Sequence, residues 1–159
     1  MTATNRWGFN ADEVVTRSRD GHNVVVVGIF VNNEVKLEPL TFTRRDGVII
    51  EYPLGMVKSD GASTPPPLWP LLPPFGVYWM AAIGHDGLYQ GTAVIIINGI
   101  RSEMMASKPF CDDTFKEMME FLGTDEDTAF KMYQGVHLMG WHSFNEDRAI
   151  QEAGAQNPQ

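Results

Sequence analysis

Hydrophobic positions in the first third of the chain predict a small antiparallel sheet. Residues 22–42 predict a β-hairpin, because residues 24–31 form a β-branched apolar run that is too continuous for a strand with one exposed face. Asn32 and Asn33 suit the turn, since asparagine tolerates positive φ, and the residues after them alternate between apolar and polar. Residues 48–52 predict a third strand after a second turn.

The following segment, residues 53–76, has a different composition. Seven of the ten prolines of the chain lie between Pro53 and Pro74, and proline is excluded from helix interiors and central strands. The segment also carries large apolar side chains, namely Leu68, Trp69, Leu71 and Leu72. We therefore expect a rigid, ordered loop that packs over the domain.

The remainder of the chain is predicted to be mainly helical. The expected helices are residues 77–90, residues 112–122 with Gly123 as a stop, and a third helix from Thr124 or Asp125 to about Trp141 or beyond. The segment between the first two helices is ambiguous, because residues 93–97 resemble a strand and Asn98-Gly99 resembles a hairpin turn.

These elements predict an α+β fold with a small N-terminal antiparallel sheet or meander, a proline-rich loop and a bundle of about three helices. We expect residues 1–20 to form an N-terminal arm, residues 21–150 a single α+β domain, and residues 151–159 a flexible or partner-bound tail. A chain of 159 residues that is 43% hydrophobic and 20% charged is long enough to bury a core without disulfides.

Charge and cysteine content narrow the function classes. The formal net charge of −8 argues against a general nucleic-acid-binding role. Cys111 is the only cysteine, so no internal disulfide can form. No apolar run reaches the length of a membrane span and the N-terminus lacks the apolar core of a signal peptide, so we expect neither feature.

The strongest chemical signal is the pentapeptide from His85 to Tyr89. His85, Asp86 and Tyr89 fall at helical-turn spacing within an apolar helix. Placing a histidine and an aspartate there costs free energy unless both find partners. A metal site or a general base would explain the pair, and so would a buried hydrogen-bond network that ties the helix to the proline-rich loop.

Asp112 is the expected partner of His85. It shares a helix face with Phe115 and Met119, so it is predicted to point inward. An inward acid at a helix start could accept the imidazole N–H of His85. The alternative is that Asp112 caps the helix N-terminus, and the two roles can coexist.

A third group lies in the segment from Ser59 to Pro65. Asp60 and Ser63 have the spacing of an Asx-turn before a proline run. The functional alternative places Asp60 or Ser63 opposite His85 in a pocket. A Ser63-His85-Asp112 triad is conceivable, although the sequence around Ser63 is not that of a nucleophile elbow.

The combination of these groups resembles a phage and prophage family, domain of unknown function 1353. The resemblance covers roughly residues 40–145 and rests on Asp60-Gly61-Ala62-Ser63-Thr64-Pro65, Ala81-Ala82-Ile83-Gly84-His85-Asp86-Gly87-Leu88-Tyr89, Asp112-x-x-Phe115-x-x-x-Met119 and Tyr133-x-x-Val136-x-x-x-Gly140-Trp141. It implies a gene of a tailed phage or prophage. Between Tyr89 and Asp112 this chain has 22 residues where the family has a shorter connection, and this insertion is expected to cover a pocket or to form a docking strand.

A second resemblance is to secreted phospholipase A2, which also carries His-Asp-x-x-Tyr on one helix and Cys-Asp at the start of another. This resemblance implies that His85 activates water, that Asp112 orients the imidazole, and that Asp86 binds Ca²⁺. Asp60 is the candidate for a second calcium ligand, and Tyr89 would support the pair. The disulfides and the glycine-rich calcium loop of those enzymes are absent from this sequence.

Two functions follow as expectations. The first is a virion-associated structural or accessory protein of a tailed phage, in the tail, baseplate or neck, which contacts other virion proteins as part of a multi-copy assembly. The alternative is a phospholipase A2-like lipid or ester hydrolase that uses His85 to help penetrate the host envelope. Only the hydrolase would require contact with a membrane, and neither function requires direct contact with nucleic acid.

Overall fold

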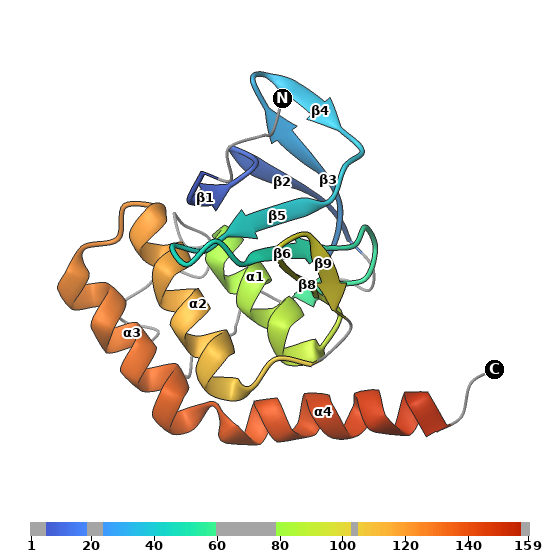
Figure 1. Cartoon of the computed structure of the whole chain (residues 1–159), viewed down its shortest axis with the longest axis vertical. Coiled ribbons are helices and arrows are strands. Elements are labelled where there is room, and N and C mark those ends of the chain that lie inside the picture. Colours follow the sequence, from blue (N-terminus) through green and yellow to red (C-terminus); the bar gives the residue numbers. More distant parts are fainter. Residues whose placement is uncertain (1–5, 19–23, 60–78, 103–104, 157–159) are drawn as a thin grey trace.

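The computed structural model describes residues 6–18, 24–59, 79–102 and 105–156 (Figure 1). Two antiparallel sheets come first in the chain and four helices follow, with a two-stranded hairpin between the first and second helix. The predicted α+β class is confirmed. The proline-rich loop that we expected at residues 53–76 lies largely outside the described residues.

The strands form two sheets. The first has the order β1-β5-β6-β8-β9, with β1 at Gly8–Phe9, β5 at Leu40–Thr43, β6 at Ile49–Tyr52, β8 at Val94–Ile97 and β9 at Ile100–Ser102. The second has the order β2-β3-β4, with β2 at Glu13–Ser18, β3 at Val24–Val31 and β4 at Glu34–Lys36, and β7 at Lys58–Ser59 also pairs with β3. The segment expected to be an N-terminal arm thus supplies a strand to each sheet.

The predicted hairpin is confirmed around its turn but not over its full length. Asn32 and Asn33 have φ values of 52° and 61°, and β3 pairs with β4 directly across them. The second strand of that hairpin was expected to continue to Phe42. Instead the chain leaves the sheet after β4, and β5 pairs with β6 in the other sheet. Pro39 lies in the gap between β4 and β5, where a residue without an N–H cannot continue a ladder.

The ambiguous segment before the second helix is a β-hairpin. Asn98 and Gly99 both adopt positive φ, as a two-residue hairpin turn requires. β8 pairs with β6, so this hairpin extends the first sheet, and β9 is its last strand.

The described residues form four helices where about three were expected. They are α1 (Trp79–Gln90), α2 (Lys108–Phe121), α3 (Glu126–Met139) and α4 (Trp141–Gln156). The predicted third helix is broken at Gly140, and the chain after it turns into α4, which lies across the ends of the other helices (Figure 1). Gly123, with a φ of 90°, ends α2 as predicted.

The predicted start of α2 was wrong by one turn. Ser107 is the N-cap and its side chain accepts the backbone N–H of Phe110. Pro109 occupies the first turn, where the missing N–H costs nothing. Asp112 is therefore inside the helix, and the alternative in which it caps the N-terminus is wrong.

The core lies where α1 meets the first sheet and α2. A Cβ built at Gly87 would come within 2.8 Å of the Tyr52 ring, and one at Gly84 within 2.7 Å of the Met118 sulfur. These two glycines therefore allow α1 to approach both β6 and α2 closely. The resulting cluster buries Phe42, Tyr52, Ile83, Leu88, Phe115, Met118 and Met132, among other residues.

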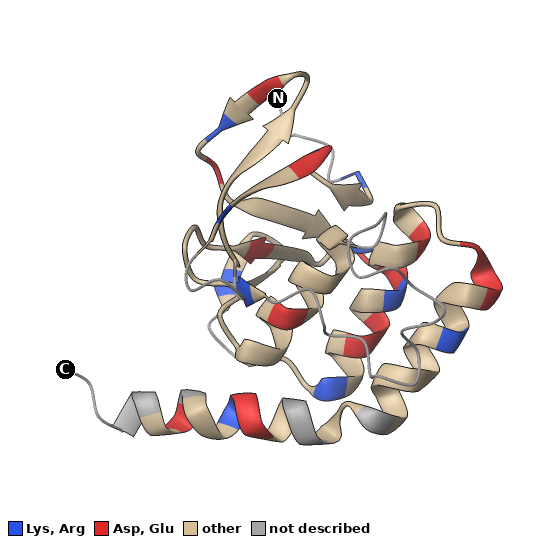
Figure 2. Ribbon diagram, turned by 180° about the vertical axis from the view of Figure 1, so that it is seen from behind, with Lys and Arg blue, Asp and Glu red and all other residues tan. Residues whose placement is uncertain are grey.

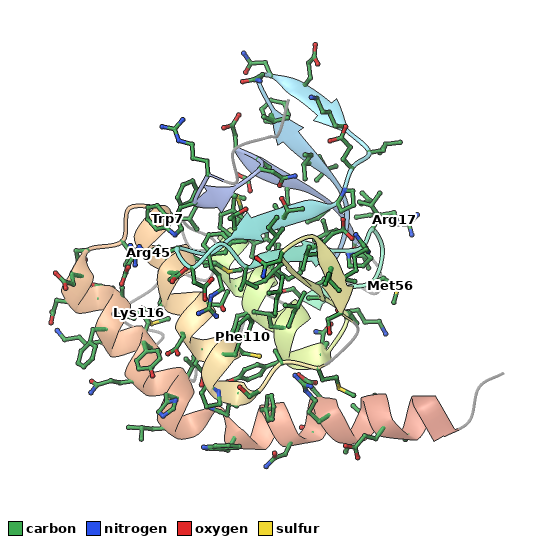
Figure 3. The ribbon with its side chains drawn as sticks, in the orientation of Figure 1. Trp7, Arg17, Arg45, Met56, Phe110 and Lys116 are labelled. Atoms are coloured by element: carbon green, nitrogen blue, oxygen red, sulfur yellow. The ribbon has the colours of Figure 1, made fainter. Side chains whose placement is uncertain are left out.

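The N-terminal residues are held against the helices by aromatic contacts. Trp7 packs edge-on against Phe121 at a centroid distance of 5.2 Å. The guanidinium of Arg45 lies 4.4 Å from the Trp7 ring centroid (Figure 3). Phe9 packs on Phe42 in the sheet core.

Charged residues are distributed over the whole molecule. Acidic positions outnumber basic ones and occur on all four helices and on several strands (Figure 2). Within the described part of the chain, no helix has the length and apolar character needed to cross a membrane.

Candidate functional site

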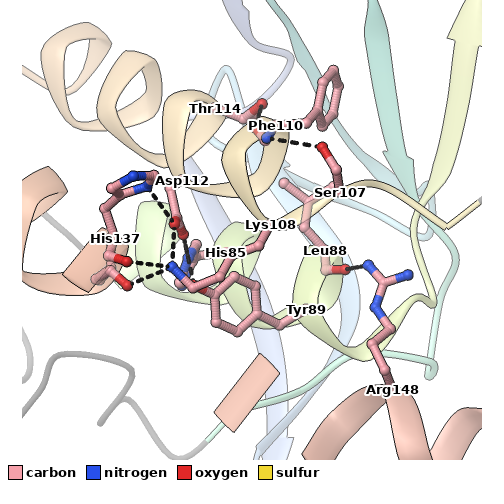
Figure 4. Close-up of polar contacts among 11 residues, drawn as sticks. His85, Leu88, Tyr89, Ser107, Lys108, Phe110, Asp112, Thr114, His137 and Arg148 are labelled. Atoms are coloured by element: carbon pink, nitrogen blue, oxygen red, sulfur yellow. Dashed lines mark hydrogen bonds and ion pairs between the residues drawn. The ribbon is translucent and has the colours of Figure 1, made fainter. Parts of the chain in front are cut away.

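His85 lies on the buried face of α1, with 1% of its surface exposed. Its Nε2 is 3.0 Å from Oδ1 of Asp112, which comes from α2 and is fully buried (Figure 4). The ring also packs against Tyr89 and Phe115, with centroid distances of 4.0 and 4.7 Å. Contact between α1 and α2 thus brings together the two residues that the sequence proposed as a pair.

The carboxylate of Asp112 is the centre of a larger polar network. The hydroxyl of Tyr89 donates a 2.6 Å hydrogen bond to Oδ1, the same oxygen that His85 contacts. The ammonium of Lys108 donates to Oδ2, also at 2.6 Å. Both carboxylate oxygens are therefore satisfied, as a buried charge requires.

Lys108 is the residue of this network that the sequence analysis missed. Its side chain has no exposed surface, and besides Asp112 it donates to the carbonyl oxygens of Val136 and His137 at 2.8 and 2.9 Å. Those carbonyls belong to the last turn of α3, where a cation is favoured by the helix dipole. The signals were present, since Ser107 and Pro109 mark a helix start and place Lys108 one turn before Asp112.

Gly140 makes room for the tyrosine of this network. A Cβ at this position would lie 2.7 Å from the Tyr89 hydroxyl and 2.4 Å from the carbonyl oxygen of Val136. The hydroxyl of Tyr89 on α1 therefore reaches the break between α3 and α4, where Gly140 has no side chain to block it. Any larger residue at position 140 would displace the Tyr89 hydroxyl.

His137 forms the outer edge of the network. Its Nδ1 is 3.5 Å from Oδ2 of Asp112, close enough for an ion pair if the ring is protonated, and 39% of its side chain is exposed. The ring stacks on Tyr133 at 5.4 Å with an interplanar angle of 14°.

Burial and hydrogen bonding fix the protonation states. Burial acts to raise the pKa of Asp112, but hydrogen bonds from His85, Lys108 and Tyr89 outweigh it and hold that pKa below the ordinary value. Burial lowers the pKa of His85, although the hydrogen bond and charge of Asp112 oppose the shift. Burial together with the hydrogen bond to Asp112 raises the pKa of Tyr89. At neutral pH the site therefore holds a carboxylate, a neutral imidazole and a phenol.

The second ring nitrogen of His85 has no hydrogen-bond partner among the described residues, although it is fully buried. A carboxylate can only accept hydrogen bonds, so the proton of the neutral ring lies on Nε2 and Nδ1 carries a lone pair. Leaving a buried acceptor unpaired costs about 1–3 kcal/mol. Nδ1 is thus the atom of the site that can accept a hydrogen bond from a donor outside the described residues.

Of the two candidate metal ligands, Asp86 and Asp60, only Asp86 lies within the described residues. Asp86, next to His85, accepts a 2.6 Å hydrogen bond from Ser59 of β7, which the sequence analysis did not identify as its partner. Asp60 and Ser63 lie outside the described residues. In residues 6–18, 24–59, 79–102 and 105–156 no group of three or more histidine, cysteine, aspartate or glutamate side chains is arranged to hold a metal ion. The Ca²⁺ site and the serine triad stay predictions.

Cys111 and Arg148 flank the site. Burial raises the pKa of the Cys111 thiol to about 12, so the thiol is protonated at neutral pH and is a poor nucleophile. Arg148 of α4 donates to the carbonyl oxygens of Leu88 and Ala106 at 3.2 and 2.5 Å. These bonds attach α4 to the end of α1 and to the segment that precedes α2.

Comparison with known families assigns the chain to one of them. The family described as "Protein of unknown function (DUF1353)" matches residues 35–136, which is more than half of the chain. The chain belongs to the DUF1353 family. His85, Tyr89, Lys108 and Asp112 all lie inside the DUF1353 match, as does the β8–β9 hairpin. No curated protein and no solved structure matches the chain.

Proposed function

We propose that this DUF1353 protein is a virion-associated structural or accessory protein of a tailed phage or prophage, and that it acts through protein contacts in the tail, baseplate or neck. The observation that carries the proposal is the β8–β9 hairpin. It ends the first sheet, and it exposes 49% of Ile97 and 72% of Ile100.

Exposed apolar side chains on an edge strand favour association with another chain, and proteins that stay monomeric usually protect such edges. The second sheet ends in the same way, because its edge strand β4 carries the exposed Val35 and the chain after it exposes Leu37. Two sheet edges with apolar side chains suit a component that is held between neighbours in a multi-copy assembly.

Purified particles provide the test. The phage that encodes the chain is propagated, banded in a density gradient and analysed by quantitative mass spectrometry. We expect the chain at a fixed multi-copy ratio to the major capsid protein. Its absence from banded particles, when it is present in the lysate, would overturn the proposal.

Point variants locate the contact. Ile97→Lys with Ile100→Lys should reduce incorporation into particles, because two charges would then face the neighbouring chain. Ile150→Lys is the matched control, since Ile150 is 66% exposed on α4. Equal incorporation of both variants would exclude the β8–β9 hairpin as the contact.

A second candidate function, a lipid or ester hydrolase, is favoured by a different observation, the unpartnered Nδ1 of His85. In this candidate Nδ1 accepts a proton from water while the water oxygen attacks the ester carbonyl, and the proton then passes to the leaving alcohol. Asp112 holds the proton of Nε2 and Tyr89 supports Asp112. The phospholipase A2-like form adds Ca²⁺ at Asp86 and Asp60, where it would polarise the carbonyl.

The hydrolase candidate is tested with phospholipid vesicles that carry a fluorescent acyl chain, with added Ca²⁺ or with EDTA. We expect acyl release that falls at least a hundredfold in His85→Gln, since removal of a general base typically costs 10²–10⁴-fold. Lys131→Met, an exposed substitution on α3, should leave the rate unchanged. Acyl release that persists in His85→Gln, or that never exceeds a protein-free blank, would reject this candidate.

A further inference from the structure

Lys108 is a charged group in a place where lysine rarely occurs. Its Nζ has three hydrogen-bond acceptors within 2.6–2.9 Å, the carboxylate of Asp112 and the carbonyl oxygens of Val136 and His137. A neutral amine has only two N–H groups, whereas an ammonium has three. Three acceptors at these distances therefore require the charged form.

The buried ammonium determines the state of Asp112. A cation without exposed surface needs a counter-charge at contact distance, and Oδ2 of Asp112 at 2.6 Å provides it. If Asp112 were protonated, the ammonium would stay uncompensated in the core. Asp112 is therefore a carboxylate, and a carboxylate can only accept the hydrogen bond from His85.

We propose that Lys108 is a positioning residue that acts through Asp112: it holds His85 as the neutral tautomer with the proton on Nε2, so that Nδ1 is a buried acceptor for one hydrogen-bond donor such as water or a hydroxyl group. The functional meaning of this inference rests on the hydrolase candidate, because a lone pair on Nδ1 is what a general base needs. The tautomer itself can be measured without any substrate.

The other titratable groups near Asp112 do not replace Lys108. From α1, Tyr89 stays protonated because burial raises its pKa, and from α2 the Cys111 thiol does so for the same reason. From α3, His137 is at ion-pair distance but makes no hydrogen bond to the carboxylate. From α4, Arg148 donates to backbone carbonyls, and Asp147 adds a negative charge.

Removal of the lysine should release the proton arrangement of the network. Without the ammonium, the carboxylate of Asp112 is no longer fixed as a pure hydrogen-bond acceptor. The proton on Nε2 of His85 is then no longer fixed either. Lys108→Met is thus expected to show a proton on Nδ1, whereas Lys131→Met is expected to keep the proton on Nε2 alone. Lys131 is the matched control because it also pairs with an aspartate four residues away at 2.6 Å, but on the surface.

The experiment is long-range ¹⁵N–¹H NMR of the histidine ring nitrogens at pH 7 on the full chain, with His85 assigned from its loss in His85→Gln. In the unsubstituted protein we expect a neutral ring with the proton on Nε2. In Lys108→Met we expect a proton on Nδ1. Lys108→Arg, which keeps the cation, should show the same tautomer as the unsubstituted protein.

Two results would overturn the inference: a proton on Nδ1 in the unsubstituted protein, or a ring in Lys108→Met that carries its proton on Nε2 alone, as in the unsubstituted protein. If Lys108→Met does not fold, the tautomers of the unsubstituted protein and of Lys108→Arg decide. Absent acyl release with the expected tautomer would reject the hydrolase and leave this inference standing. Acyl release together with a proton on Nδ1 would support the hydrolase and overturn this inference.

Discussion

Two lysine–aspartate pairs in this protein have nearly the same local geometry and different surroundings. Lys108 and Asp112 on α2 are four residues apart with an N···O distance of 2.6 Å, and so are Asp127 and Lys131 on α3. The side chains of the first pair have no exposed surface. Those of the second are 73% exposed for the aspartate and 53% for the lysine.

Because the two pairs share spacing and distance, burial is the property that distinguishes them, and we expect burial to decide what each ion pair contributes. The exposed pair stays hydrated and is screened by salt, so its loss changes little. The buried pair has lost its water, so each charge depends on the other and on the hydrogen bonds around them. That dependence is what couples Lys108 to Tyr89 and His85 through a single carboxylate.

The largest expected effect comes from removing the buried carboxylate. Asp112→Asn keeps the shape of the side chain but leaves the Lys108 ammonium without a counter-charge, so the free energy of unfolding should fall by about 3–5 kcal/mol. Asp127→Asn should leave the urea midpoint unchanged within error. Both are measured by urea denaturation at pH 7, and equal midpoints for the two variants would show that burial does not set the difference.

A smaller effect is expected from the tyrosine. Tyr89→Phe removes one hydrogen bond to the buried carboxylate and should lower the free energy of unfolding by about 1.5–3 kcal/mol. Tyr133→Phe is the control, because Tyr133 is only partly buried and its hydroxyl interacts with Asp113, which is exposed, so the substitution should matter much less. If urea denaturation gives the two variants the same loss, the Tyr89 hydroxyl is not an important support of Asp112.

The free energy of unfolding should also depend on pH through the titratable groups of the buried site. The pKa of His85 in the folded protein is below its ordinary value of 6.5, so the unfolded chain binds more protons and stability falls as the pH drops below about 6.5. One such group contributes a slope of at most about 1.4 kcal/mol per pH unit. Asp112, whose pKa is also lowered, adds a further loss below its ordinary value of 3.8.

Urea midpoints measured from pH 8 to pH 4 test this expectation. In His85→Gln the fall that begins near pH 6.5 should disappear, while Lys131→Met should keep the profile of the unsubstituted protein. A profile that is flat between pH 6.5 and pH 5 in the unsubstituted protein would contradict the lowered pKa of His85.

The smallest expected effect is that of salt. At about 1 M NaCl the screening length falls to roughly 3 Å, so any residual difference between Asp127→Asn and the unsubstituted protein should vanish. The difference caused by Asp112→Asn should persist, since ions do not enter the core. Urea denaturation at low and high salt compares the two. If high salt removed the difference in urea midpoint between Asp112→Asn and the unsubstituted protein, the site would be hydrated.

Prediction from sequence succeeded where local chemistry decides. The asparagine turns at residues 32–33 and 98–99 form as expected, because the backbone conformation of a two-residue turn depends on the residues in it. It failed where two local signals competed. Residues 34–43 have one alternating pattern, yet Pro39 divides them between two sheets.

The same contrast holds within the candidate site. His85 and Asp112 could be proposed as partners because both interrupt apolar helix faces, and an acid or a histidine in that position needs a partner. Lys108 was missed because the helix was predicted to begin at Asp112, which hid the four-residue spacing. The contact of its Nζ with the end of α3 depends on how three helices pack, and no local pattern carries that information.

The sequence by itself determined the α+β order of the fold, the positions of most of its elements and the inward faces of α1 and α2, because helical and strand periodicity are properties of neighbouring residues. Only the tertiary structure decided that Lys108, Tyr89 and His85 meet at one carboxylate, and that the equally spaced Lys131 does not. The physical reason is that desolvation is set by the whole fold, and desolvation is what turns a common ion pair into a network that fixes the proton of His85.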